Sequence, residues 1–150
     1  MPQSIEPIGS IFIALGGKRV NPHVIHEAVR MASLLGAEIK VVHMRWPGSG
    51  DPTMMMEPLP VYTEDELRDQ FRDLGYPDLA DKVVIKISKG KNVAKLLARV
   101  TKGADMLVIG HRYRNRLQTA LSMGSVQQQI LDVVSCPVLV VPRRRKKNTT

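Results

Sequence analysis

The chain has 150 residues, 43% of them hydrophobic and 24% charged, a composition typical of a single globular domain. No apolar run approaches the roughly 20 residues that a membrane-spanning helix needs. The single cysteine, Cys136, excludes an internal disulfide and a cysteine-rich zinc site. The net charge is +8, but the run Arg143 to Lys147 supplies five of these charges, so the remainder does not favour a nucleic-acid-binding protein.

The two ends of the chain carry little structural signal. Residues 1–6 lack the basic and apolar regions of a signal peptide, so we expect a cytoplasmic protein. We expect one domain over residues 1–142, followed by a basic, disordered tail over residues 143–150.

The first third of the chain alternates between strand and helix signals. Ser10 to Leu15 is a compact apolar run, typical of a strand buried on both faces. Asn21-Pro22 resembles a helix cap followed by the first helical residue, and Gly36 marks the expected helix end. This helix places Ile25, Ala28, Val29, Ala32 and Leu35 on one face. Glu38 to Met44 is the second predicted strand.

An irregular stretch, residues 45–62, follows and contains four prolines. Such long loops are usually functional or disordered, so we expect a mobile loop, with a lid over a pocket or a partner contact as alternatives. Thr63 and Glu66 then have the spacing of a capping box. They predict a helix that buries Leu67 and Phe71 and ends near Gly75.

The second half of the chain continues the alternation. Lys82 to Ser88 reads as a strand whose lysines indicate the edge of a sheet. Asn92 is expected to cap a helix with its apolar side on Leu96 and Leu97. Continuous apolar runs predict strands at Asp105 to Gly110 and at Pro137 to Val141, with a helix from Ser125 between them.

Strands that alternate with helices predict an α/β protein with an open, doubly wound, five-stranded parallel sheet and helices on both faces. In such sheets, ligands usually bind beyond the carboxyl ends of the strands, where the strand order reverses.

Glycines occur at two such strand ends. Gly16 follows the first strand, and the stretch from Gly110 to Gly124-Ser125-Val126 follows the fourth. Glycine lets the backbone approach a phosphate closely, and a helix N-terminus offers free N–H groups to an anion. The alternative is that these glycines form only a turn and that Ser125 is only a helix cap.

These residues carry a family resemblance. The segment from Gly110 to Val141, which ends GSVQQQILDVVSCPVLVV, resembles the C-terminal half of a universal stress protein domain. The segments IFIAL and EIKVVHM resemble its N-terminal half, and the resemblance spans residues 8–142. It implies a flavodoxin-like strand order 3-2-1-4-5 in a Rossmann-like fold. It also implies a homodimer through the fifth strand, residues 137–141, and in one branch ATP held between the first and fourth strands.

The resemblance also implies site residues by position. The ATP-binding branch carries the pattern G-x(2)-G-x(9)-G-[S/T], in which Gly110 matches the first glycine and Gly124-Ser125 match the closing pair. Ala14 matches a backbone position beside the nucleotide, and Met44 an apolar residue that faces adenine. The resulting candidate set is Ala14, Gly16, Met44, Gly110, His111, Arg112, Gly124, Ser125 and Val126.

Three departures from the family pattern affect this pocket. Gly16 stands where the branch has an Asp that would hold the ribose, Tyr113 stands at the second glycine, and the spacing from Gly110 to Gly124 is one residue longer. Basic residues on the same two loops could bind phosphates instead, or form a solvated rim; they are Lys18, Arg19, Arg112, Arg114 and Arg116.

The sequence offers no catalytic or metal-binding set. His23 and His26 lack a third ligand, His43 is expected to be a satisfied core histidine, and Ser125 has no adjacent base. His111 lies at the mouth of the predicted site but has no partners that would form a catalytic set. No carboxylate cluster is positioned to hold Mg²⁺ for nucleotide hydrolysis. We therefore expect a protein that is not an enzyme.

Two hypotheses for function remain. The first is a homodimeric, regulatory stress-response module that binds ATP or AMP, with Mg²⁺ only if ATP is bound. The second is a nucleotide-free module for protein–protein interaction, in which Tyr113 fills the pocket. Neither involves a membrane, and nucleic-acid binding through the basic tail is a third, disfavoured alternative.

Overall fold

A computed structural model describes residues 4–15, 21–45, 62–89, 93–110 and 133–142. No helix among these residues is long and apolar enough to cross a membrane. The strands are β1 (Ser10–Leu15), β2 (Glu38–Arg45), β3 (Val84–Lys89), β4 (Met106–Gly110) and β5 (Val138–Val141), and the helices are α1 (Pro22–Leu35), α2 (Glu64–Asp73), α3 (Pro77–Lys82) and α4 (Val93–Val100).

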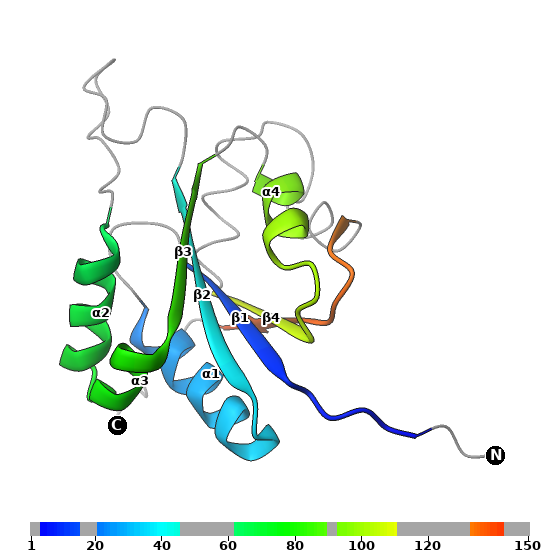
Figure 1. The fold of residues 1–150 in the computed structure, drawn as a ribbon, viewed down its shortest axis with the longest axis horizontal. Coiled ribbons are helices and arrows are strands. Elements are labelled where there is room, and N and C mark those ends of the chain that lie inside the picture. Colours follow the sequence, from blue (N-terminus) through cyan, green and yellow to red (C-terminus); the bar gives the residue numbers. More distant parts are fainter. Residues whose placement is uncertain (1–3, 16–20, 46–61, 90–92, 111–132, 143–150) are drawn as a thin grey trace, which may run out of the picture.

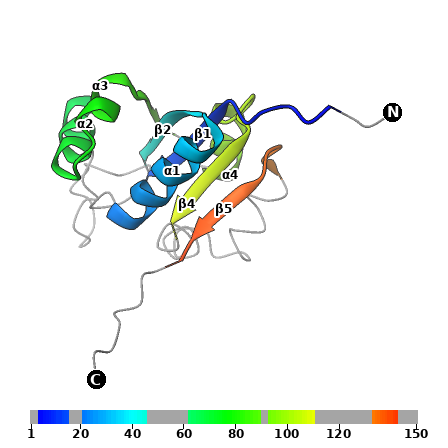
Figure 2. The ribbon, with the colours of Figure 1, turned by 90° about the horizontal axis from the view of Figure 1, so that it is seen from below.

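The strands form one parallel sheet in the order β3-β2-β1-β4-β5. Helices α1, α2 and α3 lie on one face of this sheet and α4 lies on the other (Figures 1 and 2). The α/β fold, the strand order and the edge position of β3 are thus confirmed. The helix expected from Ser125 lies outside the described residues.

Each face of the sheet buries its own apolar cluster. Toward α1, α2 and α3, the side chains of Ile13, Val41 and Phe71 are fully buried. Toward α4, Leu97 and Leu107 are fully buried. Burial on both faces explains why the central strands are continuous apolar runs rather than alternating ones.

The boundaries of α1 follow from its capping residues. The Asn21 side-chain oxygen accepts a hydrogen bond from the His23 amide at 3.0 Å, and Gly36 ends the helix with a left-handed φ of 66°. Ala28 is buried on the predicted inner face, but Leu35 is 37% exposed. Leu35 is the last helical residue, so no following turn covers it.

The short helix α3 was not expected from the sequence. Pro77 occupies its first turn, and the Arg68 guanidinium on α2 donates a hydrogen bond to the carbonyl oxygen of Ala80. Arg72 forms an ion pair with Asp81 at 3.1 Å. Helix α3 takes up Lys82, so the third strand begins at Val84 rather than at Lys82.

The carboxylate of Asp105 joins the starts of β1 and β4. One of its oxygens accepts hydrogen bonds from the Gly9 amide at 2.8 Å and from the Ser10 amide at 2.9 Å. These bonds favour the ionised form, the Gly9 bond most strongly, and lower the pKa of Asp105.

We predict that Asp105→Asn flattens the acid limb of the stability profile. Because the pKa of Asp105 is lowered in the folded state, its contribution is fully present above the ordinary Asp pKa of about 4. The contribution disappears as the pH falls through the lowered folded-state value. Urea unfolding at a series of pH values from neutral to acid measures the effect. Parallel profiles for the wild type and the variant would contradict this role.

Candidate functional site

The strand order reverses between β1 and β4, which are adjacent although most of the chain between them builds the other half of the sheet. Ile13 of β1 pairs with Val108 of β4, so the carboxyl ends of the two strands, Leu15 and Gly110, lie at the same edge of the sheet. This is the position at which a doubly wound sheet usually binds its ligand.

Gly110 is the point of closest approach between β4 and the start of α1. A Cβ built on Gly110 would lie 2.9 Å from Cγ2 of Val24 and 3.9 Å from Nδ2 of Asn21. The first of these distances is too short for a real contact, so the position requires glycine unless Val24 moves. Glycine here has a structural reason, because it brings the first turn of α1 beside the end of β4.

The N-terminus of α1 therefore lies at the point where the strand order reverses. Asn21 satisfies the amide of His23, and the remaining amides of the first turn have no partner within the helix itself. Such an end attracts anions through its N–H groups and its dipole. The arrangement could therefore receive a phosphate.

His43 closes the same edge of the sheet from β2. Its side chain is 2% exposed. Its Nδ1 lies 3.1 Å from the Leu15 carbonyl oxygen, and its Nε2 lies 3.4 Å from the amide nitrogen of Tyr62. A carbonyl only accepts and an amide only donates, so both contacts fit one neutral tautomer with the proton on Nδ1. His43 therefore links the end of β1 to the residue that leads into α2.

Two of the predicted site residues fall on described strands near this edge. Ala14 is 2% exposed and packs with Phe12, Val42 and Leu97 in the core, so only its backbone could contact a ligand. Met44 is a residue of β2 that pairs with Ser88. Since neighbouring strand residues alternate between faces, Met44 and the buried His43 face opposite sides of the sheet.

Gly110 is thus the predicted residue whose environment is defined most fully. The others lie outside the described residues and are Gly16, His111, Arg112, Gly124, Ser125 and Val126. The same holds for Tyr113 and for the basic residues of the two loops.

Two residues at this edge were not anticipated from the sequence as parts of a site. Asn21 was read only as a helix cap, yet its side chain also approaches Gly110. Tyr62 belongs to the end of the long irregular stretch, and its ring packs against the His43 ring with centroids 5.6 Å apart. An isolated aromatic residue directly before a capping box was the only signal for Tyr62.

The described residues contain no group of three or more His, Cys, Asp or Glu side chains that could hold a metal ion. His26 instead forms a hydrogen bond with the Tyr76 hydroxyl. Burial raises the pKa of the Cys136 thiol, so at neutral pH this residue is a thiol packed beside the α4 cluster and not a reactive thiolate.

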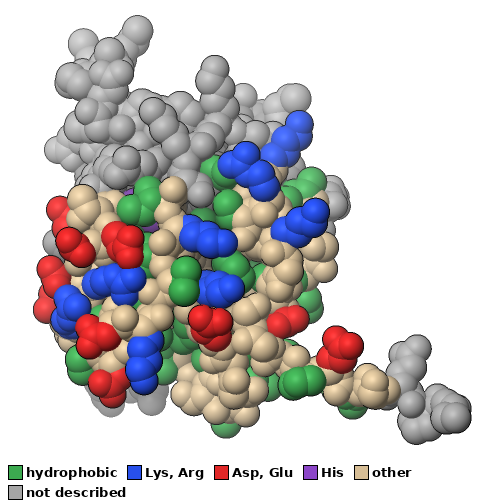
Figure 3. Space-filling view, viewed as in Figure 1, with side chains coloured by type: hydrophobic (Ala, Val, Ile, Leu, Met, Phe, Trp, Pro, Cys, Tyr) green, Lys and Arg blue, Asp and Glu red, His purple; other side chains and the backbone are tan. Residues whose placement is uncertain are grey.

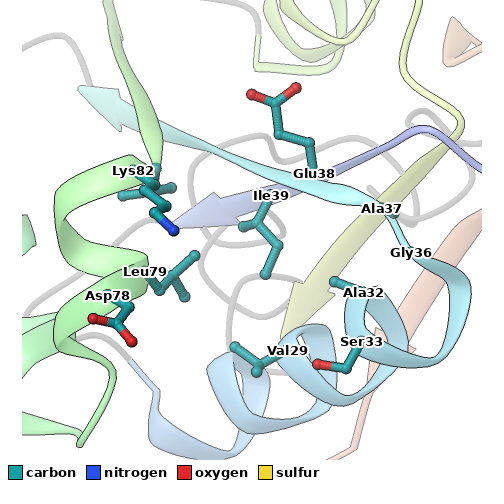
Figure 4. Close-up of a pocket in the computed structure, with 11 residues that line it drawn as sticks. Val29, Ala32, Ser33, Gly36, Ala37, Glu38, Ile39, Asp78, Leu79 and Lys82 are labelled. Atoms are coloured by element: carbon teal, nitrogen blue, oxygen red, sulfur yellow. The ribbon is translucent and has the colours of Figure 1, made fainter.

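A separate groove of about 380 Å³ lies between α1, α3 and the start of β2 (Figure 4). Its floor is apolar and includes Val29, Ile39 and Leu79, and the charged residues Asp78 and Lys82 stand on its rim. The groove is beside the N-terminal end of β2. It therefore lies at the opposite end of the sheet from the predicted ligand site.

Comparison with known proteins supports the fold and a family. The model of the universal stress protein family matches residues 8–142. No curated protein matches the sequence at a significant level.

Several solved structures are similar. A universal stress protein in complex with cAMP is 16% identical, has a TM-score of 0.57, and is covered over 93% of this chain and 100% of that chain. A universal stress protein from Lactobacillus plantarum is 16% identical, with a TM-score of 0.58 and coverage of 91% and 99%. A family member from Burkholderia pseudomallei is 22% identical, with a TM-score of 0.52 and coverage of 90% and 96%. At these identities the similarity is one of fold.

Proposed function

This chain belongs to the universal stress protein family, and we propose that it acts in the cytoplasm as a homodimeric stress-response module that binds an adenine nucleotide, AMP or ATP. Binding, and not catalysis, is the proposed activity. Mg²⁺ would accompany ATP only.

The close approach at Gly110 carries this proposal. It brings the first turn of α1 beside the carboxyl ends of β1 and β4, where the fold class usually binds its ligand. The similar universal stress protein that was solved with cAMP supports an adenine nucleotide as the class of ligand.

The proposed contacts follow the family pattern. Backbone amides at Gly16, Gly110 and Gly124, with the Ser125 hydroxyl, would hold the phosphates. Arg112 and the other basic loop residues would supply charge in place of the missing Asp. His111, Val126 and the backbone of Ala14 would line the pocket, and Met44 would contact the base.

A second candidate function is a nucleotide-free interaction module. Packing against Val24 already explains why residue 110 is glycine, so the glycine alone does not require a ligand. Gly16 and Tyr113 also replace an Asp and a glycine of the nucleotide-binding branch.

Calorimetric titration with AMP, ATP and cAMP, with and without Mg²⁺, tests the proposal. We predict binding that Ser125→Ala weakens by roughly 10- to 100-fold, the effect of removing a hydrogen bond to a charged group. Gly124→Val should weaken binding at least as much, because it blocks the approach of the backbone.

Ser33→Ala is the matched control, because Ser33 lines the groove between α1 and α3 at the other end of the sheet. This variant should bind like the wild type. Thermal unfolding shows whether Ser125→Ala still folds. Absence of heat and of a thermal shift at millimolar nucleotide would reject nucleotide binding and favour the interaction module.

The proposed homodimer joins two copies through β5. This strand is an edge of the sheet, and its residues Val138, Leu139 and Val140 are apolar and only half-buried. An exposed apolar edge needs a cover, and pairing with the same strand of a second copy provides one with twofold symmetry.

We therefore predict that Leu139→Lys yields monomers in light scattering at physiological salt. Leu34→Lys, at a side chain of α1 that is 73% exposed, is the control and should leave the dimer intact. Circular dichroism must show that both variants fold. A folded Leu139→Lys protein that remained dimeric would exclude β5 as the interface.

A further inference from the structure

Charge is strongly segregated along the middle of the chain. Residues 62–82, which include α2 and α3, contain seven of the fourteen Asp and Glu residues but only three Lys or Arg. Residues 83–104, which include β3 and α4, contain six Lys or Arg and no Asp or Glu. Two oppositely charged segments are thus consecutive in sequence.

The fold places these segments on the two sides of β3. In Figure 1, α2 and α3 lie on one side of this strand and α4 on the other. Figure 3, from the same direction, shows acidic side chains gathered over α2 and α3, and basic side chains over β3 and toward α4. We call these areas the acidic side and the basic side of the β3 face.

The acidic side keeps negative charge after its internal ion pairs are counted. Arg68 pairs with Glu64 at 2.7 Å, and Arg72 pairs with Asp69 and Asp81. Three exposed carboxylates of α2 and α3 have no ion pair among the described residues; they are Asp65, Asp73 and Asp78.

The basic side concentrates positive charge at β2, β3 and α4. The Nζ atoms of Lys40 and Lys86 lie 5.5 Å and 5.7 Å from the centre of the same Phe12 ring. The ring face attracts both ammonium groups and offsets part of their repulsion. Lys95 and Arg99 add exposed cations one turn apart on α4.

The strand between the two sides is an open edge with exposed apolar side chains. Val84 is 39% exposed and Ile87 is 36% exposed. Together, the β3 face has an apolar centre flanked by opposite charges.

From this juxtaposition we propose that the β3 face binds the β3 face of a second copy of the same chain. A twofold axis parallel to β3 places the acidic side of each copy opposite the basic side of the other, so both charge contacts are attractive. An axis across the strand would instead oppose like charges. The exposed residues Val84 and Ile87 would meet near the axis.

This interface is distinct from the proposed β5 dimer, because β3 and β5 are opposite edges of the sheet. Two twofold interfaces at opposite edges join chains alternately into an open array and not into a closed dimer. Exposed charge pairs are individually weak and are screened by salt. Association through the β3 face should therefore be strong only at low ionic strength.

Sedimentation velocity of the full chain, at roughly 0.02 M and 0.5 M salt, measures this association. We expect the weight-average mass at least to double at low salt, to rise with protein concentration, and to fall back at high salt. A mass that is the same at both salt concentrations would overturn the proposal, and an acidic protein or a nucleic acid would then be the remaining partner for the basic side.

Charge reversal tests the geometry. Lys86→Glu/Arg99→Glu makes both sides acidic, and Asp65→Lys/Asp73→Lys makes both sides basic. Neither variant should show the low-salt association alone, but an equimolar mixture should recover it. A mixture that stays as small as its components would contradict the proposed pairing.

Arg30→Glu is the control for net charge, because it reverses an exposed residue of α1 that pairs with Glu27. This variant should still associate at low salt. The Leu139→Lys variant separates the two interfaces, since it should form only a salt-sensitive dimer through β3. A β3 association that fails in a protein that still dimerises through β5 rejects this inference alone.

Discussion

Replacing Gly110 with valine is expected to lower the free energy of unfolding by about 1–3 kcal/mol, the usual effect of overpacking a buried position. The first added carbon would lie 2.9 Å from Cγ2 of Val24, and the branched side chain adds two more carbons. Either α1 or the end of β4 must move, so nucleotide binding should also be lost. Urea unfolding and calorimetric titration measure the two effects.

A double-mutant cycle shows whether Val24 is the cause. Gly110→Ala and Val24→Ala should each destabilise the protein, but the double variant should lose less than the sum of both effects. Gly9→Ala is the matched glycine control, because its Cβ would meet only Asp105 at an ordinary 3.4 Å. Additive effects of the two alanine substitutions would show that the contact does not constrain residue 110.

Replacing His43 with phenylalanine is expected to have a similarly large effect. The ring is buried, so its loss leaves the Leu15 carbonyl and the Tyr62 amide without this partner. Each such group costs about 1–3 kcal/mol when no water replaces the bond. The Tyr62 amide should exchange with solvent faster in the variant, which hydrogen-exchange NMR detects.

His43→Gln is the informative comparison, because glutamine keeps one donor and one acceptor and should lose less stability than phenylalanine. His23→Phe, on the half-buried part of α1, is the control for adding an aromatic ring. Unchanged exchange at Tyr62 in His43→Phe would refute the link between β1 and the start of α2.

Most of the fold was predictable because its signals are local or periodic. Strands buried on both faces have continuous apolar runs, and the lysines of β3 indicated an edge. The strand order came from the family resemblance, because alternation fixes the fold class but not the order. Helix α3 was missed because six residues are too few for a periodic pattern.

The site was less predictable because its contacts join distant parts of the chain. The sequence indicated a buried His43, but its partner Tyr62 is 19 residues away, beyond the irregular stretch. Gly110 was interpreted as a ligand-binding glycine, and only the structure revealed its contact with Val24. A glycine pattern cannot distinguish close packing from close approach to a phosphate.

The central claim is that the nucleotide binds where β1 and β4 end. Amide chemical shifts recorded during titration with AMP or ATP test it most directly. We predict that the largest shifts occur at Leu15, Gly110 and the first turn of α1, while Gly36 and Leu79 of the groove between α1 and α3 are unaffected. Shifts confined to that groove, or none at millimolar nucleotide, would contradict the account.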